Sequence, residues 1–268
     1  MRDTIRLIVT DMDGTLLDAA HQLPPGFPEI VMGLRQRGVR WAIASGRQLA
    51  NLKKRFDALS VPVEIIAENG ALALCAGEDE PFFCDLTPVT RFTDILTAAL
   101  AVPGATPVLC GATCAWVHNA YPENFTEVAR YFEKTEQWQT LAEVAHLDLC
   151  KIAVYHPDAA GTLHPALAPF ECPDVRVILS GPNWVDVQSA TIDKRHALEA
   201  VMQRFGYTPQ NVMVFGDYLN DAGMLQGGVH GVAMGNALPE ILALTPYHAR
   251  PNTQNGVINY LQTMGLLP

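Results

Sequence analysis

The sequence predicts an α/β fold built on a parallel sheet, with an inserted α+β domain. Three observations lead to this prediction. Apolar segments alternate with helical segments near both ends of the chain, a pattern that predicts parallel strands joined by right-handed crossovers. The strands expected in these parts are apolar without interruption, as in strands buried on both faces. Between about residues 81 and 186 the expected strands alternate or carry polar interruptions, which favours an open and largely antiparallel sheet.

The first expected strand starts at Ile5 and ends in two carboxylates and a glycine, Asp11, Asp13 and Gly14. The carboxyl edge of a parallel sheet is where α/β proteins bind ligands. Asp11 and Asp13 share a face if the backbone is extended, and two neighbouring carboxylates repel unless a cation or a proton separates them. A divalent metal is therefore expected here. An acidic surface turn is the alternative interpretation, because Asp and Gly are common in turns.

The second expected strand covers residues 39–44 and ends at Ser45, Gly46 and Arg47. A hydroxyl, a flexible backbone and a guanidinium suit a cluster of anionic oxygens, and together they predict a phosphate site. On this tripeptide alone, a Ser at a helix entry followed by a solvated Arg is an equally good interpretation.

The other elements of the two outer parts continue the alternation of strand and helix. Proline, glycine and capping residues mark the helix ends. The expected helices span residues 25–37, 48–59, 193–205, 238–244 and 256–264, and the expected strands span residues 63–67, 211–215 and 231–234.

A second acidic strand end follows residues 211–215, where Asp217 and Asp221 stand. If a helix begins at Tyr218, Asp217 lies at its N-terminus and Asp221 lies one turn later on the same side. Lys194, at the start of the helix before this strand, reaches the same edge of the sheet. The strand ends together supply three carboxylates, a lysine and a hydroxyl.

The insertion is expected over residues 81–186, which leaves residues 1–80 and 187–268 for the core domain. We expect its helices to cover one face of its sheet. Its expected helices span residues 87–101, 123–135 and 158–170, and its expected strands span residues 106–110, 114–117, 147–155, 175–179 and 184–187.

The composition excludes several classes of protein. Of the 268 residues, 49% are hydrophobic and 17% are charged, as in a globular protein with a large core. The formal net charge is −10 and no basic run is visible, so we expect no nucleic-acid partner. No apolar run has the length that a bilayer requires, so we expect no membrane partner. The six cysteines include no C-x-x-C pair and no apolar signal segment precedes the first strand, so we expect a cytoplasmic protein with reduced thiols. Nothing in the sequence indicates an oligomeric state.

The residues at the strand ends predict phosphoryl transfer. Carboxylates beside a lysine and a hydroxyl bind a hard cation next to a phosphate, and Mg²⁺ with retained waters fits this ligand set best. The cation and Lys194 would neutralise the phosphoryl oxygens. Asp11 could attack in line to form an aspartyl-phosphate, and Asp13 could protonate the departing alcohol and then activate water.

Four motifs, in chain order, resemble those of the haloacid dehalogenase superfamily of phosphatases. They are Asp11-Met12-Asp13-Gly14-Thr15, Ser45-Gly46-Arg47, Asp193-Lys194 and Gly216-Asp217-Tyr218-Leu219-Asn220-Asp221. Three further segments resemble the Cof-like branch, which largely hydrolyses small phosphorylated metabolites such as sugar phosphates. These are Glu68-Asn69-Gly70-Ala71, Ala233-Met234-Gly235-Asn236-Ala237 and Asn255-Gly256-Val257. The resemblance implies a Rossmann-like core with an α/β cap domain.

The resemblance also implies a role for each matched residue. Asp11 is the nucleophile and Asp13 the general acid and base. The phosphoryl group is bound by Met12, Ser45, Gly46 and Lys194. The substrate is contacted by Arg47, Asn69 and Asn220. Magnesium is held by the Asp11 carboxylate, the Asp13 backbone carbonyl and Asp217, with Asp221 and Asn220 in support.

Spacing indicates where the cap is inserted. Only 31 residues lie between Asp13 and Ser45, whereas 146 lie between Arg47 and Lys194, so the cap follows the third strand. In the family, a cap at this place closes over the site and selects the leaving group. The chain departs from the family pattern at Arg195, where Gly is usual, and at residues 253–255, where acidic residues are usual.

Other functions fit parts of this pattern. A phosphomutase or a more specialised sugar-phosphate phosphatase shares the Asp-x-Asp motif and a similarly placed cap. A non-catalytic sensor of phosphate ligands could keep the fold, but it need not retain Asp11, Asp13 and Lys194 together. A nucleotide-binding dehydrogenase fits less well, because no G-x-G-x-x-G follows the first strand.

Overall fold

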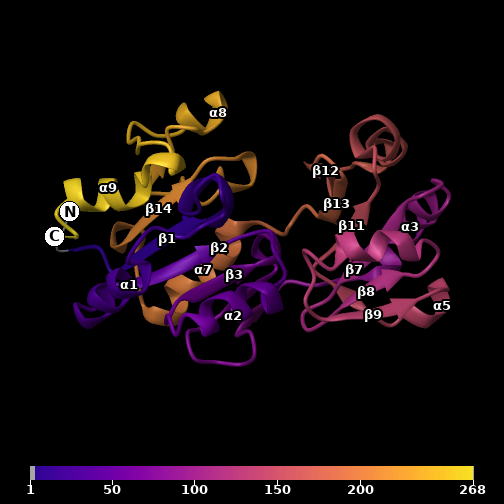
Figure 1. The fold of residues 1–268 in the computed structure, drawn as a ribbon, viewed down its shortest axis with the longest axis horizontal. Coiled ribbons are helices and arrows are strands. Elements are labelled where there is room, and N and C mark those ends of the chain that lie inside the picture. The colour runs from indigo at the N-terminus through magenta and orange to yellow at the C-terminus, as the bar shows by residue number, and fades with distance from the viewer. Residues whose placement is uncertain (1–3, 268) are drawn as a thin grey trace. The chain divides into compact units, whose positions relative to one another are not determined.

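The computed structural model describes residues 4–267, which form two compact units (Figure 1). The first unit comprises the residues up to Gly46, Leu52–Phe83 and the residues from Asp193 onward. The second unit comprises Arg47–Asn51 and Cys84–Ile192. The boundary expected between residues 186 and 187 falls inside a strand, β13 (Trp184–Ser189), which pairs within the second unit along its length.

The described part of the first unit is built on a seven-stranded sheet in the order β15-β14-β1-β2-β3-β4-β5. Its strands are β1 (Leu7–Asp11), β2 (Arg40–Ala44), β3 (Glu64–Ala67), β4 (Leu72–Leu74), β5 (Phe83–Cys84), β14 (Val212–Gly216) and β15 (His230–Ala233). The strands from β15 to β3 pair in parallel, and β4 is antiparallel to β3. The predicted α/β class with a parallel sheet is confirmed. Because β2 and β14 flank β1, the order of the strands reverses there, and such switch points are where open α/β sheets bind ligands.

Helices flank this sheet (Figure 1). They are α1 (Phe27–Gln36), α2 (Leu49–Ala58), α7 (Lys194–Phe205), α8 (Pro239–Leu242) and α9 (Gly256–Thr263). The buried residues of α1 recur at helical spacing and are Phe27, Val31 and Leu34. The ring of Phe27 packs edge-on against Trp41 of β2, with 5.2 Å between the ring centroids. Asp193 caps α7 by accepting the backbone N–H of Arg195, and Gly206 ends the helix in the left-handed conformation.

The second unit has its own six-stranded sheet among the described residues, in the order β12-β13-β11-β7-β8-β9, and a short pair, β10-β6. Its strands are β6 (Thr87–Pro88), β7 (Thr106–Cys110), β8 (Ala115–His118), β9 (Thr135–Trp138), β10 (Asp148–Leu149), β11 (Lys151–Tyr155), β12 (Val175–Gly181) and β13. All neighbours in the larger sheet are antiparallel except β8 and β9. The expectation of a largely antiparallel sheet is confirmed.

Helices lie against both faces of this sheet, so the prediction of a single covered face is wrong. One apolar cluster joins α3 (Thr93–Leu100) and α6 (His164–Leu167) to alternate strand residues such as Val154. A second cluster, which includes Ala153, joins α4 (Phe125–Val128) to the opposite face. Adjacent residues of β11 therefore belong to different clusters, because side chains alternate across a strand.

The helices of this unit are also shorter than predicted. Residues 158–170 contain Gly161, Pro165 and Pro169, and only His164–Leu167 is regular α-helix there. Each proline lacks a backbone N–H and so interrupts helical hydrogen bonding. The helix predicted over residues 123–135 is regular only in α4, and β9, which begins at Thr135, is a strand that the sequence did not predict. Another short helix of this unit, α5, spans Leu141–Val144.

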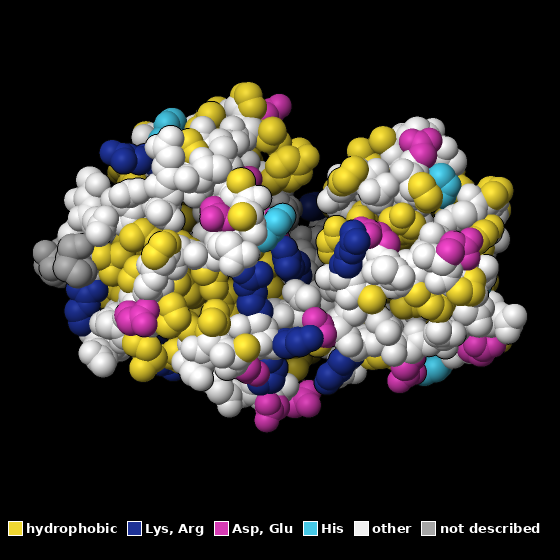
Figure 2. Space-filling model, in the orientation of Figure 1, with side chains coloured by type: hydrophobic (Ala, Val, Ile, Leu, Met, Phe, Trp, Pro, Cys, Tyr) yellow, Lys and Arg dark blue, Asp and Glu magenta, His cyan; other side chains and the backbone are white. Residues whose placement is uncertain are grey.

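The surface drawn in Figure 2 carries acidic, basic and hydrophobic side chains interspersed in each unit. Exposed large hydrophobic residues such as Met32 and Leu59 are few. In the part of the chain that the structure describes, no helix has both the length and the apolar character needed to cross a membrane.

Candidate active site

Three chain segments leave the sheet of the first unit at one edge. Asp11 is the last residue of β1, a strand that is buried throughout. On one side of β1, Asp11 pairs with Ala44, the last residue of β2, and Ser45 follows directly. On the other side, β14 ends at Gly216, just before Asp217. Parallel strands present their carboxyl ends together, and for that reason the polar residues after β1, β2 and β14 share this edge.

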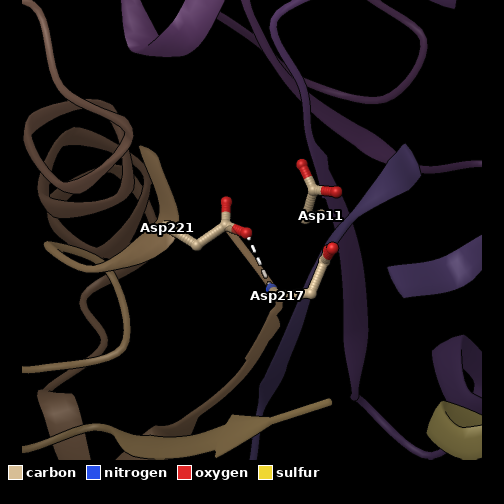
Figure 3. Close-up of side chains that lie close together, drawn as sticks. All are labelled: Asp11, Asp217 and Asp221. Atoms are coloured by element: carbon tan, nitrogen blue, oxygen red, sulfur yellow. Dashed lines mark hydrogen bonds between the residues drawn. The ribbon is translucent and has the colours of Figure 1, made fainter. Parts of the chain in front are cut away.

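Three carboxylates meet at the edge (Figure 3). Asp11, Asp217 and Asp221 each offer an oxygen atom within 4.8 Å of the others. Asp11 and Asp221 are buried, and Asp217 is partly buried. The Asp221 carboxylate also accepts the backbone N–H of Asp217, with an N to Oδ2 distance of 2.9 Å (Figure 3). Hard oxygen donors in this number and closeness fit a divalent cation such as Mg²⁺.

Lys194 lies beside this cluster with no exposed surface. Its Nζ donates to Asp11 Oδ1 at 2.5 Å and to Asp221 Oδ1 at 2.6 Å. Burial alone would lower the pKa of Lys194, but the two carboxylates outweigh it, and the pKa is raised above its ordinary value. The ammonium therefore stays charged, and it balances only one of the three carboxylates.

The pKa values of two carboxyl groups in the cluster, those of Asp11 and Asp217, are raised above their ordinary values. Burial is the main cause that raises the pKa of Asp11 well above its ordinary range, against the lowering effect of Lys194. Burial also raises the pKa of Asp217 to about 6, and neighbouring Asp221 adds to this. Additional positive charge would remove the repulsion among these groups. The residues present thus fit a divalent cation by charge as well as by donor type.

Asp217 is held from the first motif. The hydroxyl of Thr15 donates to Asp217 Oδ1 at 2.6 Å. Gly14 leaves room for the carboxylate, because a Cβ at that position would lie 2.3 Å from Asp217 Oδ2, and its φ of +86° also favours glycine. The side-chain amide of Asn236 donates to the Gly14 carbonyl at 2.8 Å and so fixes this turn.

The helix considered from Tyr218 onward is only a short helical turn, Leu219–Asp221. Asp221 folds back, and its Oδ2 accepts the backbone N–H groups of Asp217 and Tyr218. Short polar side chains compete in this way with regular helix hydrogen bonding. The result places the other oxygen of Asp221 against Lys194.

Asp13 lies in the turn after β1, within Met12–Leu16, and its side chain is 40% exposed. Its carboxylate is not one of the three in the cluster. Asp13 Oδ1 instead lies 3.2 Å from Nδ1 of His21. A metal role for Asp13 would fall to its backbone carbonyl, as the resemblance of the motifs implies, which leaves the carboxyl group for proton transfer.

The phosphate-binding and substrate-binding residues predicted at β2 and β3 come together in part. Ser45 is buried, and its carbonyl accepts the backbone N–H of Asn69 at 3.1 Å. A Cβ on Gly46 would lie 2.7 Å from Asn69 Oδ1, the atom that accepts the side-chain amide of Asn220 at 3.2 Å. Asn69 has a φ of +58°, and the following Gly70 has a φ of +101°. This left-handed turn brings Asn69 against Gly46.

A family model for haloacid dehalogenase-like hydrolases matches residues 8–261 of the chain. The chain belongs to this family. It is 30% identical over 256 residues to the HMP-PP phosphatase of Cronobacter sakazakii, a match that covers 90% of the chain and 88% of that protein. It is 26% identical over 267 residues to the 5-amino-6-(5-phospho-D-ribitylamino)uracil phosphatase YbjI of Escherichia coli, with coverage of 96% and 95%.

The structure of SMU.1108c from Streptococcus mutans has the same fold, with a TM-score of 0.82 at 22% identity over 98% of the chain and 100% of that structure. The resemblance inferred from the motifs is confirmed. So is the enzyme class expected from it, a phosphatase of the haloacid dehalogenase type.

Two residues matched to this family are less well defined by the structure. The Met12 side chain is fully buried, so a phosphate contact would fall to its backbone. Arg47 begins the segment 47–51 that groups with the second unit. Its role toward substrate stays a prediction.

Arg195 departs from the haloacid dehalogenase pattern without disturbing the start of α7. Its backbone N–H donates to the capping carboxylate of Asp193 at 2.8 Å, and its Nε donates to Glu199 Oε1 at 2.7 Å. The side chain is thus directed along the helix surface, and Lys194 keeps its buried position.

Sequence reasoning assigned no role to Thr15, Asn236 or His21. Thr15 and Asn236 lie within segments that resemble the haloacid dehalogenase family, and this resemblance is the sequence signal that could have assigned them to the site. Their contacts, to Asp217 and to Gly14, join parts of the chain 202 and 222 residues apart. His21 stands outside every motif.

Proposed function

We propose that this phosphatase hydrolyses small phosphorylated metabolites through an aspartyl-phosphate on Asp11, with Mg²⁺ as cofactor. The observation that carries the proposal is the arrangement at the sheet edge, where Asp11 shares the ammonium of Lys194 with Asp221 and lies beside Asp217. A carboxylate next to a buried lysine and a cation site is suited to attack a phosphate dianion.

Each residue has a distinct part in this reaction. Asp11 attacks phosphorus in line, and the bond to the leaving oxygen breaks as Asp13 transfers a proton to that oxygen. Lys194 and the groups after β2 bind the phosphoryl oxygens. Asp13, now deprotonated, takes a proton from the water that attacks the aspartyl-phosphate, which releases phosphate and restores Asp11.

Magnesium would be held by Asp11 and Asp217, with the Asp13 carbonyl as a further ligand and Asp221 and Asn220 in support. When bound, it supplies positive charge that reduces the repulsion between the Asp11 carboxylate and the phosphate dianion. Thr15 keeps Asp217 in place for this, and Asp221 holds Lys194.

The relatives suggest the size and kind of substrate. HMP-PP and 5-amino-6-(5-phospho-D-ribitylamino)uracil are phosphorylated small molecules, and the enzymes named for them align over nearly the whole chain. We infer that the substrate of this enzyme is also a small phosphorylated metabolite, either a sugar phosphate or a similar phosphomonoester. The cytoplasmic location and the absence of a nucleic-acid partner stay predictions from composition.

We also infer that residues 81–186 act as a cap that selects the leaving group. The proposed catalytic and phosphate-binding residues lie outside that range. Replacing Cys84–Ile192, the continuous part of the second unit, with a short Gly/Ser linker should keep slow hydrolysis of an aryl phosphate and abolish discrimination among sugar phosphates. If the shortened protein folds and ranks sugar phosphates as the parent does, the core selects the substrate.

The test is a phosphate-release screen over sugar phosphates, nucleotides, pyridoxal phosphate and flavin mononucleotide. Wild type should release phosphate with Mg²⁺ present, chelation should stop turnover, and added Mg²⁺ should restore it. Asp11→Asn, which keeps the shape of the side chain and loses its charge, should remain folded and inactive. Full activity after exhaustive chelation would refute the metal role, and near-normal turnover by Asp11→Asn would refute the covalent route.

A further inference from the structure

We propose that His21 is a positioning residue for Asp13. Its imidazole Nδ1 lies 3.2 Å from Asp13 Oδ1, across eight residues of chain. The two side chains are 68% and 40% exposed, so burial does not hold them together. The inference rests on the proposed function, in which Asp13 passes a proton to the leaving oxygen.

The turn that carries His21 is fixed by several hydrogen bonds. Asp18 Oδ1 accepts the backbone N–H of Ala20 at 2.8 Å and of Gln22 at 2.9 Å. The backbone N–H of His21 donates to the Asp18 carbonyl at 3.0 Å. From α2, the guanidinium of Arg55 donates to the His21 carbonyl at 2.8 Å. The backbone of His21 is therefore held from both sides, which fixes where its side chain leaves the chain.

The backbone of His21 also adopts a conformation that favours glycine, with a φ of +56°. Glycine adopts this conformation at no steric cost, whereas a side chain there is strained, least so for Asn, Asp and His. Strained residues persist where the surrounding structure holds them, and they are concentrated at functional sites. At this position the chain carries an imidazole that contacts the proposed acid.

The contact determines how the Asp13 carboxyl group is turned. The backbone beside Asp13 is already fixed, because Asn236 holds the Gly14 carbonyl at 2.8 Å. A partner on Oδ1 then sets the rotation of the carboxyl group and the direction of Oδ2. Proton transfer needs the carboxyl oxygen within hydrogen-bond reach of the leaving oxygen, so a misdirected group slows the step in which the P–O bond breaks.

The test compares two substitutions at His21. His21→Gly removes the imidazole and relieves the strain, so the protein should fold. His21→Asn tolerates the same backbone conformation and carries a side-chain N–H close to the position of Nδ1. Ala19→Gly, an exposed change in the same turn, is the control. The readout is kcat/KM, which reports the steps up to departure of the leaving group, for an aryl phosphate and for an alkyl phosphate.

His21→Gly should lower kcat/KM for the alkyl phosphate about tenfold and for the aryl phosphate less than about twofold, because a good leaving group needs little protonation. His21→Asn should recover most of the loss, and Ala19→Gly should match wild type. In an Asp13→Asn background, His21→Gly should have no further effect.

Equal losses for both substrates, no loss, or an undiminished loss in the Asp13→Asn background would overturn the role of His21. These outcomes leave the proposed function standing as long as Asp13→Asn itself is selective for the alkyl phosphate. If Asp13→Asn lowers kcat/KM equally for both substrates, the acid role of Asp13 is refuted, and the positioning role of His21 is refuted with it.

Discussion

Lys194→Met removes a buried ammonium that two carboxylates share. Lys194 and Asp221 have no exposed side-chain surface, and the Asp11 side chain is 10% exposed. Methionine fills similar volume with a flexible chain, so the main loss is the charge and not the packing. Removing one partner of a buried ion pair costs about 3–5 kcal/mol. Set against a total stability of about 5–15 kcal/mol, this is a large fraction.

The loss should depend on pH with a definite sign. Asp11 and Asp217 have pKa values raised above their unfolded values, and Lys194 works against both increases. Without it, the folded-state pKa values rise further. A raised carboxyl pKa means that the folded protein holds protons that the unfolded chain releases, so stability falls as the pH rises from the unfolded pKa through the folded pKa. The variant should therefore be much closer to wild type at about pH 5 than at about pH 7.5.

Urea unfolding of both proteins, without metal and at both pH values, measures the difference. Lys53→Met is the matched control, because Lys53 pairs with Asp57 at 2.8 Å on the exposed side of α2 and should lose less than about 1 kcal/mol. Saturating Mg²⁺ should restore part of the stability of Lys194→Met, since it adds positive charge to the same cluster. A loss below about 1 kcal/mol at about pH 7.5, or a loss that does not change with pH, would refute this account of the charges.

Three more predictions concern the cation and phosphate sites. Burial raises the pKa of Asp217 to about 6, so the affinity for Mg²⁺ should increase as the pH rises through about 6. An affinity, measured by calorimetry, that does not change with pH would exclude Asp217 as a ligand. Thr15→Val removes the hydroxyl that donates to Asp217 at 2.6 Å and should weaken Mg²⁺ binding about tenfold, whereas Thr15→Ser should not; equal affinities would contradict the role of this bond. Gly46→Ala places a Cβ 2.7 Å from Asn69 Oδ1, so displacement of Asn69 should lower kcat/KM about tenfold; unchanged kinetics would remove Asn69 from the site.

The sequence was sufficient for the parts of the fold that depend on local pattern. The apolar runs before Asp11 and Asp217 predict buried parallel strands, and their common edge then follows from the geometry of a parallel sheet. Asp193 is a good N-cap and Gly206 a good helix end, which predicts α7 and so the position of Lys194.

Features that depend on tertiary contacts were not predictable in this way. The segment after Asp217 forms only a short helical turn, because Asp221 Oδ2 accepts two backbone N–H groups while its Oδ1 accepts a hydrogen bond from Lys194. The contact of Thr15 with Asp217 spans 202 residues and has no local pattern. The contact of His21 with Asp13 depends on a left-handed residue that propensity disfavours.

Detection of phosphate on Asp11 tests the proposed reaction most directly. Asp13→Asn with an aryl phosphate should form the aspartyl-phosphate, because a good leaving group needs no proton, but should hydrolyse it slowly, because the base is lost. After acid quench and digestion with pepsin at low pH, which preserves an acyl phosphate, the peptide that contains Asp11 should carry one phosphoryl group on Asp11 by mass spectrometry. The doubly substituted Asp11→Asn, Asp13→Asn protein should carry none. Turnover by wild type with no phosphoryl group on this peptide in Asp13→Asn, or a phosphoryl group at another residue, would contradict Asp11 as the nucleophile.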